Sequence, residues 1–206
     1  MEVVTVQGLE IAYERAGSGP PLVLVHGAAE SGRVWQPQIE ALADEFAVVA
    51  WDEPGAGRSS DVPEDFGLAD YAACLAGLIE ALGAAPAHVA GLSWGGTVVL
   101  ELYRRHPEHV GTLIFADSYA GWKGSLPEAE VRARVAGAGR MLAAPAAAFD
   151  PTLPGLFAVG PPAEFAGLMA EIAAAVRPQS LRTQTSVMAA ADQRDLLPRV
   201  AVPTLL

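Results

Sequence analysis

The sequence is poor in basic residues, in cysteine and in long apolar runs. Its 13 Lys and Arg stand against 24 Asp and Glu, a formal net charge of -11, which disfavours nucleic acid and anionic membrane surfaces as partners. The single cysteine, Cys74, excludes an internal disulfide and a C-x-x-C metal pair. No apolar run approaches the ~20 residues that a membrane helix needs, and the first residues are acidic where a signal peptide is basic. We therefore predict a cytoplasmic protein with no nucleic-acid partner and no membrane partner.

Short apolar runs alternate with helical patterns along the first 119 residues. The runs PLVLV, AVVAW, HVAGLS and VGTLIFADS predict buried strands, and the stretches VWQPQIEALADEF, LADYAACLAGLIEALG and WGGTVVLELYRRH between them have helical spacing. The first 19 residues alternate on either side of Gly8 and predict a hairpin. Because helices separate the later strands, we predict an α/β fold with a mainly parallel sheet and helices on both faces.

The alternation lapses after residue 119, which suggests three parts in the chain. Residues 1–119 are the predicted core. Residues 120–176 are rich in alanine, proline and glycine, but their aromatic and aliphatic side chains are too many for a linker and predict an inserted helical cap. Residues 177–206 return to a core pattern and end in a predicted strand.

Ser93 stands between glycines where a predicted strand changes to a predicted helix. The stretch 91–95, GLSWG, matches G-x-S-x-G, the pattern of a nucleophile elbow. Such a turn holds the serine in strained backbone geometry with its hydroxyl exposed, so the flanking residues must be small. The N-terminus of the following helix favours a developing oxyanion. The alternative is a serine that only caps the helix.

The stretch HGAAESG after the first buried strand offers a second donor for an oxyanion. Small residues after His26 and Gly27 let a backbone N-H turn toward the elbow, so the N-H groups of Ala28 and Trp94 are the candidate oxyanion donors. The His26 side chain is a candidate base, but a histidine that fixes this turn by hydrogen bonds is the favoured interpretation.

A second glycine-rich loop, DEPGAGRSS, follows the strand AVVAW. It lacks the G-K-[ST] ending of a phosphate-binding loop. Gly55 and Gly57 are therefore interpreted as turn glycines, and Asp52 as a carboxylate that holds the loop through backbone hydrogen bonds.

Together these stretches resemble the α/β-hydrolase family, in its group of capped esterases, lactonases and C-C hydrolases. The stretches HGAAESGRVW, DEPGAGRS, GLSWGG, LIFADS and PRVAVPTLL follow the family's order over nearly the whole chain. The resemblance implies a serine nucleophile, which is Ser93, an Asp or Glu after a later strand, and a histidine after the last strand. It places the triad Asp and His beyond residue 206, so we expect the C-terminal part of the core to be missing and these 206 residues alone to be inactive.

None of the four histidines is expected to act as the base for Ser93. His88 precedes Ser93 by five strand residues, which is about 16 Å at ~3.3 Å per residue. His106 and His109 flank Pro107 at the amino-terminal edge of the sheet and are expected to be solvated loop residues. Asp117, after the strand LIFA, is a possible triad acid, and a carboxylate that caps the next turn is an equal alternative.

The predicted function is hydrolysis of a carboxylic ester or lactone through an acyl-enzyme on Ser93. C-C bond hydrolysis or perhydrolysis on the same scaffold, and non-catalytic binding of a small ligand, remain alternatives. We expect a small apolar acyl or lactone substrate, no metal and no organic cofactor, and homo-oligomers are possible. Candidate pocket residues are His26, Trp35, Trp122, Met141, Phe149 and Phe157.

Overall fold

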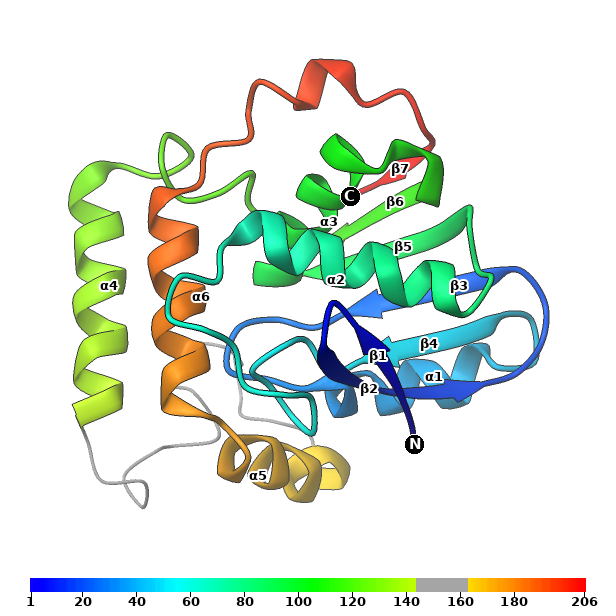
Figure 1. Ribbon diagram of the computed structural model, residues 1–206. Helices are drawn as coiled ribbons and strands as arrows, with labels where there is room; N and C mark the ends of the chain where they lie inside the picture. The colour runs from blue at the N-terminus through cyan, green and yellow to red at the C-terminus, as the bar shows by residue number, and fades with distance from the viewer. Residues whose placement is uncertain (144–162) are drawn as a thin grey trace.

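The computed structural model (Figure 1) describes residues 1–143 and 163–206. In that part of the chain one sheet has the strand order β1-β2-β4-β3-β5-β6-β7. The strands are β1 Glu2–Val6, β2 Leu9–Ala16, β3 Pro21–Val25, β4 Ala47–Trp51, β5 Ala87–Leu92, β6 Val110–Ala116 and β7 Thr204–Leu205. β1 and β2 form the predicted antiparallel hairpin, β2 also runs antiparallel to β4, and the other pairs are parallel. The predicted mainly parallel sheet is confirmed.

The sheet is covered on both faces, because successive side chains of a strand point to opposite sides. In β3, Val23 and Val25 belong to one apolar cluster, with helices α2 (Leu68–Ala81) and α3 (Trp94–Arg105). Leu22 and Leu24 belong to a second cluster with Ile39 of helix α1 (Gln36–Leu42). The uninterrupted apolar run of β3 is therefore the consequence of a strand that is buried from both sides.

Helix α2 follows the predicted apolar stripe. Leu75, Leu78 and Ile79 are fully buried in the larger cluster, and so is Cys74. The chain leaves the helix through Gly83, whose φ of +61° lies in the left-handed region that favours glycine.

Three further helices lie beyond the carboxyl ends of the parallel strands (Figure 1). They are α4 Glu128–Ala143, α5 Ala166–Ala174 and α6 Pro178–Ala190. Helices α4 and α6 pack together, and α5 contacts the 3-10 helix η1 (Gly32–Trp35). Short 3-10 helices also occur at η2 Pro107–His109, η4 Ala163–Phe165 and η5 Leu197–Arg199. The predicted boundary at residue 176 falls between α5 and α6, and the division into core and cap remains a prediction.

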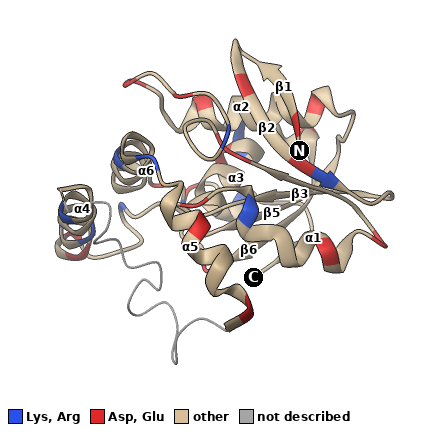
Figure 2. Ribbon diagram, turned by 90° about the horizontal axis from the view of Figure 1, so that it is seen from below, with Lys and Arg blue, Asp and Glu red and all other residues tan. Residues whose placement is uncertain are grey.

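The surface is predominantly acidic, as the net charge of -11 requires. In Figure 2 acidic segments lie on the β1–β2 hairpin, on α1 and on α5. Within residues 1–143 and 163–206, no helix is both long enough and apolar enough to span a bilayer.

Candidate active site

Ser93 occupies the turn between the end of β5 and the start of α3. Its φ of 51° and ψ of -112° are sparsely populated for a residue with a side chain. Its N-H donates to the carbonyl of Ala116 at the end of β6 (2.9 Å), and its own carbonyl accepts from Gly96 (3.0 Å). The Ser93 side chain makes no capping hydrogen bond, which speaks against the interpretation as a helix cap.

The glycines around Ser93 are required because the backbone is crowded on every side. A methyl group at Gly91 would lie 2.6 Å from the backbone nitrogen of Gly96, and one at Gly95 would lie 2.7 Å from the carbonyl oxygen of His26. A methyl group at Gly96 would overlap the side chain of Ser118. Carbon atoms do not approach that closely, so the G-x-S-x-G-G spacing has a steric cause in this fold.

The turn after β3 holds two of its backbone N-H groups in hydrogen bonds. The N-H of Gly27 donates to Oε2 of Glu30 (2.8 Å), and the N-H of Ala29 donates to Oε1 of Gln184 in α6 (3.1 Å). Between them, the N-H of Ala28 has no acceptor among the described residues. The N-H of Trp94, in the first turn of α3, likewise has no acceptor there. These two N-H groups are the ones that the sequence suggested as oxyanion donors.

A buried glutamate links the two sides of this region. Oε2 of Glu53, in the loop after β4, accepts from the indole Nε1 of Trp94 (2.6 Å). Its Oε1 accepts from Nε2 of Gln184, whose own Oε1 accepts from Ala29. Glu53, Trp94 and Gln184 are fully buried. These hydrogen bonds thus connect Trp94, the residue after Ser93, through Glu53 and Gln184 to Ala29 in the turn after β3.

Two carboxyl groups beside these turns have pKa values near neutrality. Burial raises the pKa of Glu53 to about 8, against the opposing effect of the hydrogen bonds from Trp94 and Gln184. Enclosure of its carboxyl group raises the pKa of Glu30 to about 7, although part of that side chain reaches the surface. A proton on either group removes a negative charge that would oppose an oxyanion nearby.

His26 fixes the local turns and is not free to act as a base. Its Nδ1 lies 2.8 Å from the carbonyl oxygen of Gly27, and its Nε2 accepts from the N-H of Glu53 (3.1 Å). Burial lowers the pKa of His26, which agrees with a neutral ring whose Nδ1 carries the proton. The favoured interpretation of His26 as a turn-fixing residue is confirmed. Since its ring is fully buried, it does not face an open pocket.

Asp52 holds the neighbouring loop as predicted. Its carboxylate accepts from the N-H of Gly32 (2.8 Å) and from the N-H of Arg58 (2.9 Å). Gly55 and Gly57 adopt φ values of +86° and +51°, so both are turn glycines.

Asp117 lies beside Ser93 at the same edge of the sheet. The parallel register pairs Leu92 with Ala116, so the residues that follow them, Ser93 and Asp117, are neighbours. Asp117 is exposed, has a φ of 45°, and forms no hydrogen bond with a described residue. A role as triad acid remains a prediction.

The other three histidines lie far from Ser93 along the strands. His88 is near the start of β5, and His106 and His109 are in the turn before β6. The expectation that both turn histidines are solvated is wrong for His109, which is only 5% exposed. It packs beneath the end of α2, where Glu80 reaches it.

The predicted pocket residues that the structure describes lie in several different elements, and a pocket formed by them remains a prediction. Trp35 is half-buried in η1, next to the second apolar cluster. Trp122 is buried in the first cluster, with the Arg134 guanidinium 5.4 Å from its ring centre. Met141 is exposed on α4. Phe149 and Phe157 lie outside the described residues.

Sequence reasoning missed Glu53 and Gln184. Glu53 could have been suspected weakly, because it is the second of two acidic residues directly after a buried strand, where a side chain has little access to water. Gln184 gave none, since its partners are 131 and 155 residues away in the sequence.

Comparison with known proteins agrees with this geometry. A family model described as alpha/beta hydrolase fold matches residues 20–203. The chain is 35% identical over 127 residues to a protein of Azorhizobium caulinodans assigned as the carbamate hydrolase RutD, a match that covers 61% of this chain and 48% of that protein. The chain thus spans about half the length of this curated relative.

Two solved structures are similar over almost the whole chain. A hydrolase from Pseudomonas aeruginosa superposes with a TM-score of 0.77 at 26% identity, covering 98% of this chain and 77% of that one. A thermophilic esterase from Thermogutta terrifontis superposes with a TM-score of 0.76 at 28% identity, covering 99% and 78%.

Proposed function

Since the chain belongs to the alpha/beta hydrolase fold family, we propose that it forms the nucleophile-bearing part of a serine hydrolase that cleaves a carboxylic ester or lactone. One observation carries the proposal: Ser93 is held at φ 51°, ψ -112° directly before α3, whose first N-H group, that of Trp94, has no acceptor among the described residues. Strained geometry of this kind costs about 1–3 kcal/mol and persists where the surroundings impose it.

In the proposed reaction, Oγ of Ser93 attacks the carbonyl carbon of the substrate. The carbonyl oxygen becomes an oxyanion and accepts hydrogen bonds from the N-H groups of Ala28 and Trp94. The tetrahedral intermediate collapses as the C-O bond to the alcohol breaks, the leaving oxygen takes the proton that the base removed from Ser93, and the acyl group stays on Ser93. Water then attacks the acyl-enzyme and releases the acid.

The proton of Ser93 needs an acceptor, and none of the four histidines of the sequence is placed to be one. His26 is engaged at both ring nitrogens, and the other three histidines lie toward the amino ends of the strands. The proposal therefore requires a base other than these four histidines, and Asp117 is the carboxylate best placed to orient it. Without such a base, the rate falls by several powers of ten.

A carbamate is the second candidate substrate class, favoured by the similarity to RutD. Carbamates and esters share the planar carbonyl that the elbow would attack, so the same donors serve both. Hydrolysis rates on matched aryl esters, lactones and carbamates of equal acyl length separate the two classes.

The test is the intact mass of the native protein before and after reaction with a fluorophosphonate, beside the Ser93→Ala variant. Ser118→Ala serves as a control hydroxyl at the same sheet edge. We expect one adduct in the native protein and in Ser118→Ala, and none in Ser93→Ala. The absence of any adduct, or an adduct that survives in Ser93→Ala, would contradict the proposal. The same spectrum shows whether the native mass exceeds 21.3 kDa.

A further inference from the structure

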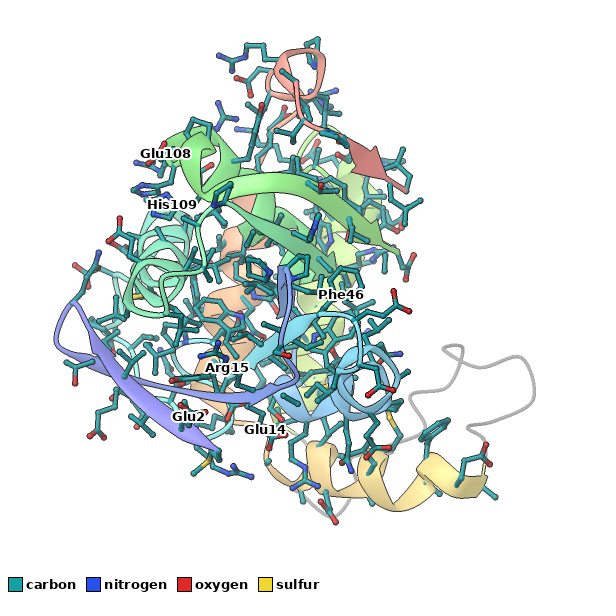
Figure 3. The ribbon with its side chains drawn as sticks, turned by 90° about the vertical axis from the view of Figure 1, so that its right-hand side faces the viewer. Glu2, Glu14, Arg15, Phe46, Glu108 and His109 are labelled. Carbon is teal, nitrogen blue, oxygen red and sulfur yellow. The ribbon has the colours of Figure 1, made fainter. Side chains whose placement is uncertain are left out.

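Two histidines and a glutamate meet in the turn between α3 and β6. His106 follows the last turn of α3, and Glu108 and His109 form the 3-10 helix η2 with Pro107. Figure 3, which views the molecule toward the amino ends of the parallel strands, shows Glu108 and His109 close together. Ser93 lies at the other end of β5, so this cluster is separate from the proposed active site.

The distances within the cluster suit a small divalent cation. Nδ1 of His109 lies 3.2 Å from Oε1 of Glu108, and Nδ1 of His106 lies 3.7 Å from the same oxygen. One ligand atom from each of the three residues lies within 4.8 Å of the others. A tetrahedral zinc ion with bonds of about 2.0–2.1 Å keeps its ligand atoms roughly 3.3–3.5 Å apart, so only small side-chain movements separate the observed arrangement from a coordinated one.

The environment of His109 points to a ligand on its Nδ1. Its side chain is only 6% exposed, and its Nε2 lies 3.0 Å from Oε1 of Glu80 in α2. A proton on Nε2, donated to Glu80, leaves a lone pair on Nδ1. Nδ1 is buried and has no hydrogen-bond partner among the described residues, although the oxygen of Glu108 is near. A lone pair that faces a carboxylate oxygen is unfavourable, and either a proton on Nδ1 or a cation between the two atoms relieves it. The observed geometry gives such a proton no hydrogen bond, so a cation is the alternative that we develop.

Glu80 completes the arrangement that metal-binding histidines commonly have. Such a histidine usually donates its second ring N-H to a carboxylate, which fixes the tautomer and raises the basicity of the other nitrogen. The two carboxylates, Glu80 and Glu108, also balance the charge of a divalent ion. The nearest arginines in the sequence are engaged elsewhere, Arg104 with Asp195 and Arg105 with Glu101.

We propose that His106, Glu108 and His109 bind one zinc ion, with water at the remaining position and Glu80 as the partner of His109. Two imidazoles and a carboxylate are a ligand set typical of zinc. The ion joins the end of α2, the end of α3 and the start of β6, so its role is to stabilise these connections. It takes no part in the proposed hydrolysis, and a failure of either proposal leaves the other intact.

The test is a titration of chelator-treated, dialysed protein with zinc chloride in competition with a chromophoric chelator at pH 7.5. We expect one zinc ion per chain. His106→Ala and Glu108→Ala, both at surface positions, should each weaken the affinity at least tenfold. Glu80→Ala should weaken it by about 10–100-fold through His109. The matched control is His88→Ala, which removes a histidine at the same end of the sheet whose ring packs against Phe46 and is not one of the three grouped ligands, and it should leave the affinity unchanged.

Thermal unfolding gives an independent readout, because an ion that binds only the folded state raises the Tm. Zinc should raise the Tm of the wild type and of His88→Ala, and should not raise that of His106→Ala. The absence of binding at micromolar zinc, or binding that His106→Ala and Glu108→Ala leave unchanged, would overturn the proposal.

Discussion

Replacing Glu53 with glutamine should remove a loss of stability that the protein otherwise suffers between pH 5 and pH 8. Burial raises the pKa of Glu53 from 4.5 to about 8. A carboxyl whose pKa is higher in the folded state holds its proton more tightly there, so stability falls as the pH rises between the two values and levels off above the higher one. At about 1.4 kcal/mol per pKa unit, this group alone lowers the free energy of unfolding by about 3–4 kcal/mol from pH 5 to pH 8.

The assay is urea unfolding of the wild type and of Glu53→Gln at pH 5, 6, 7 and 8. The useful quantity is the difference between the two free energies at each pH, since other titrating groups such as Glu30 contribute to both. In the variant, the NH2 group of the introduced glutamine must face the donor of either Trp94 or Gln184. This unfavourable contact lowers the free energy of unfolding by about 1–3 kcal/mol at every pH. Glu64→Gln, at an exposed carboxyl, is the control. If the wild-type and Glu53→Gln curves run parallel, the reasoning about burial is refuted.

Three other predictions concern packing, the link between Ala29 and Glu53, and the single thiol. Gly95→Ala should lower the free energy of unfolding in urea by at least about 1–3 kcal/mol, because the added methyl meets the backbone at the end of β3. Gly139→Ala, in α4 with open space around it, should raise that free energy by roughly 0.5–1 kcal/mol, and a loss there would contradict the packing argument. Gln184→Met should lower it by about 1–3 kcal/mol, since the N-H of Ala29 and an oxygen of Glu53 lose their partner; unchanged thermal unfolding would show that water replaces the amide. Burial raises the pKa of Cys74 to about 11, so mass spectrometry should find no alkylation by iodoacetamide in the native protein and complete alkylation in urea, and rapid native labelling would place this thiol outside the core.

Much of the fold was predictable because its signals are local. The strand at residues 21–25 and the helix at residues 68–81 follow from apolar patterns within a few residues, and the structure has both. The elbow at Ser93 was also predictable, since tight turns restrict the size of immediate neighbours. His26 could be interpreted correctly because its partners, Gly27 and the N-H of Glu53, belong to adjacent predicted loops.

The surroundings of the candidate site were less predictable. Trp35, Trp122 and Met141 share an apolar character, but the sequence does not specify which cluster or surface each one joins. The three occupy η1, the first core cluster and the exposed side of α4. Hydrophobic periodicity specifies which residues face inward, but it does not specify which helices and strands pack together. The prediction of a pocket depended on knowing which elements pack together.

The sequence by itself determined the strands of the parallel sheet and the tight turn at Ser93, because each depends on a pattern within a short segment of the chain. Only the tertiary structure decided that Gln184 completes the hydrogen bonds of Glu53 and that Glu80 reaches His109. In both cases the energy comes from burying a polar group opposite a partner that is remote in the chain, 131 residues away for Gln184 and 29 for Glu80. Such pairings exist only once the helices have packed on the sheet, so no local pattern in the sequence encodes them.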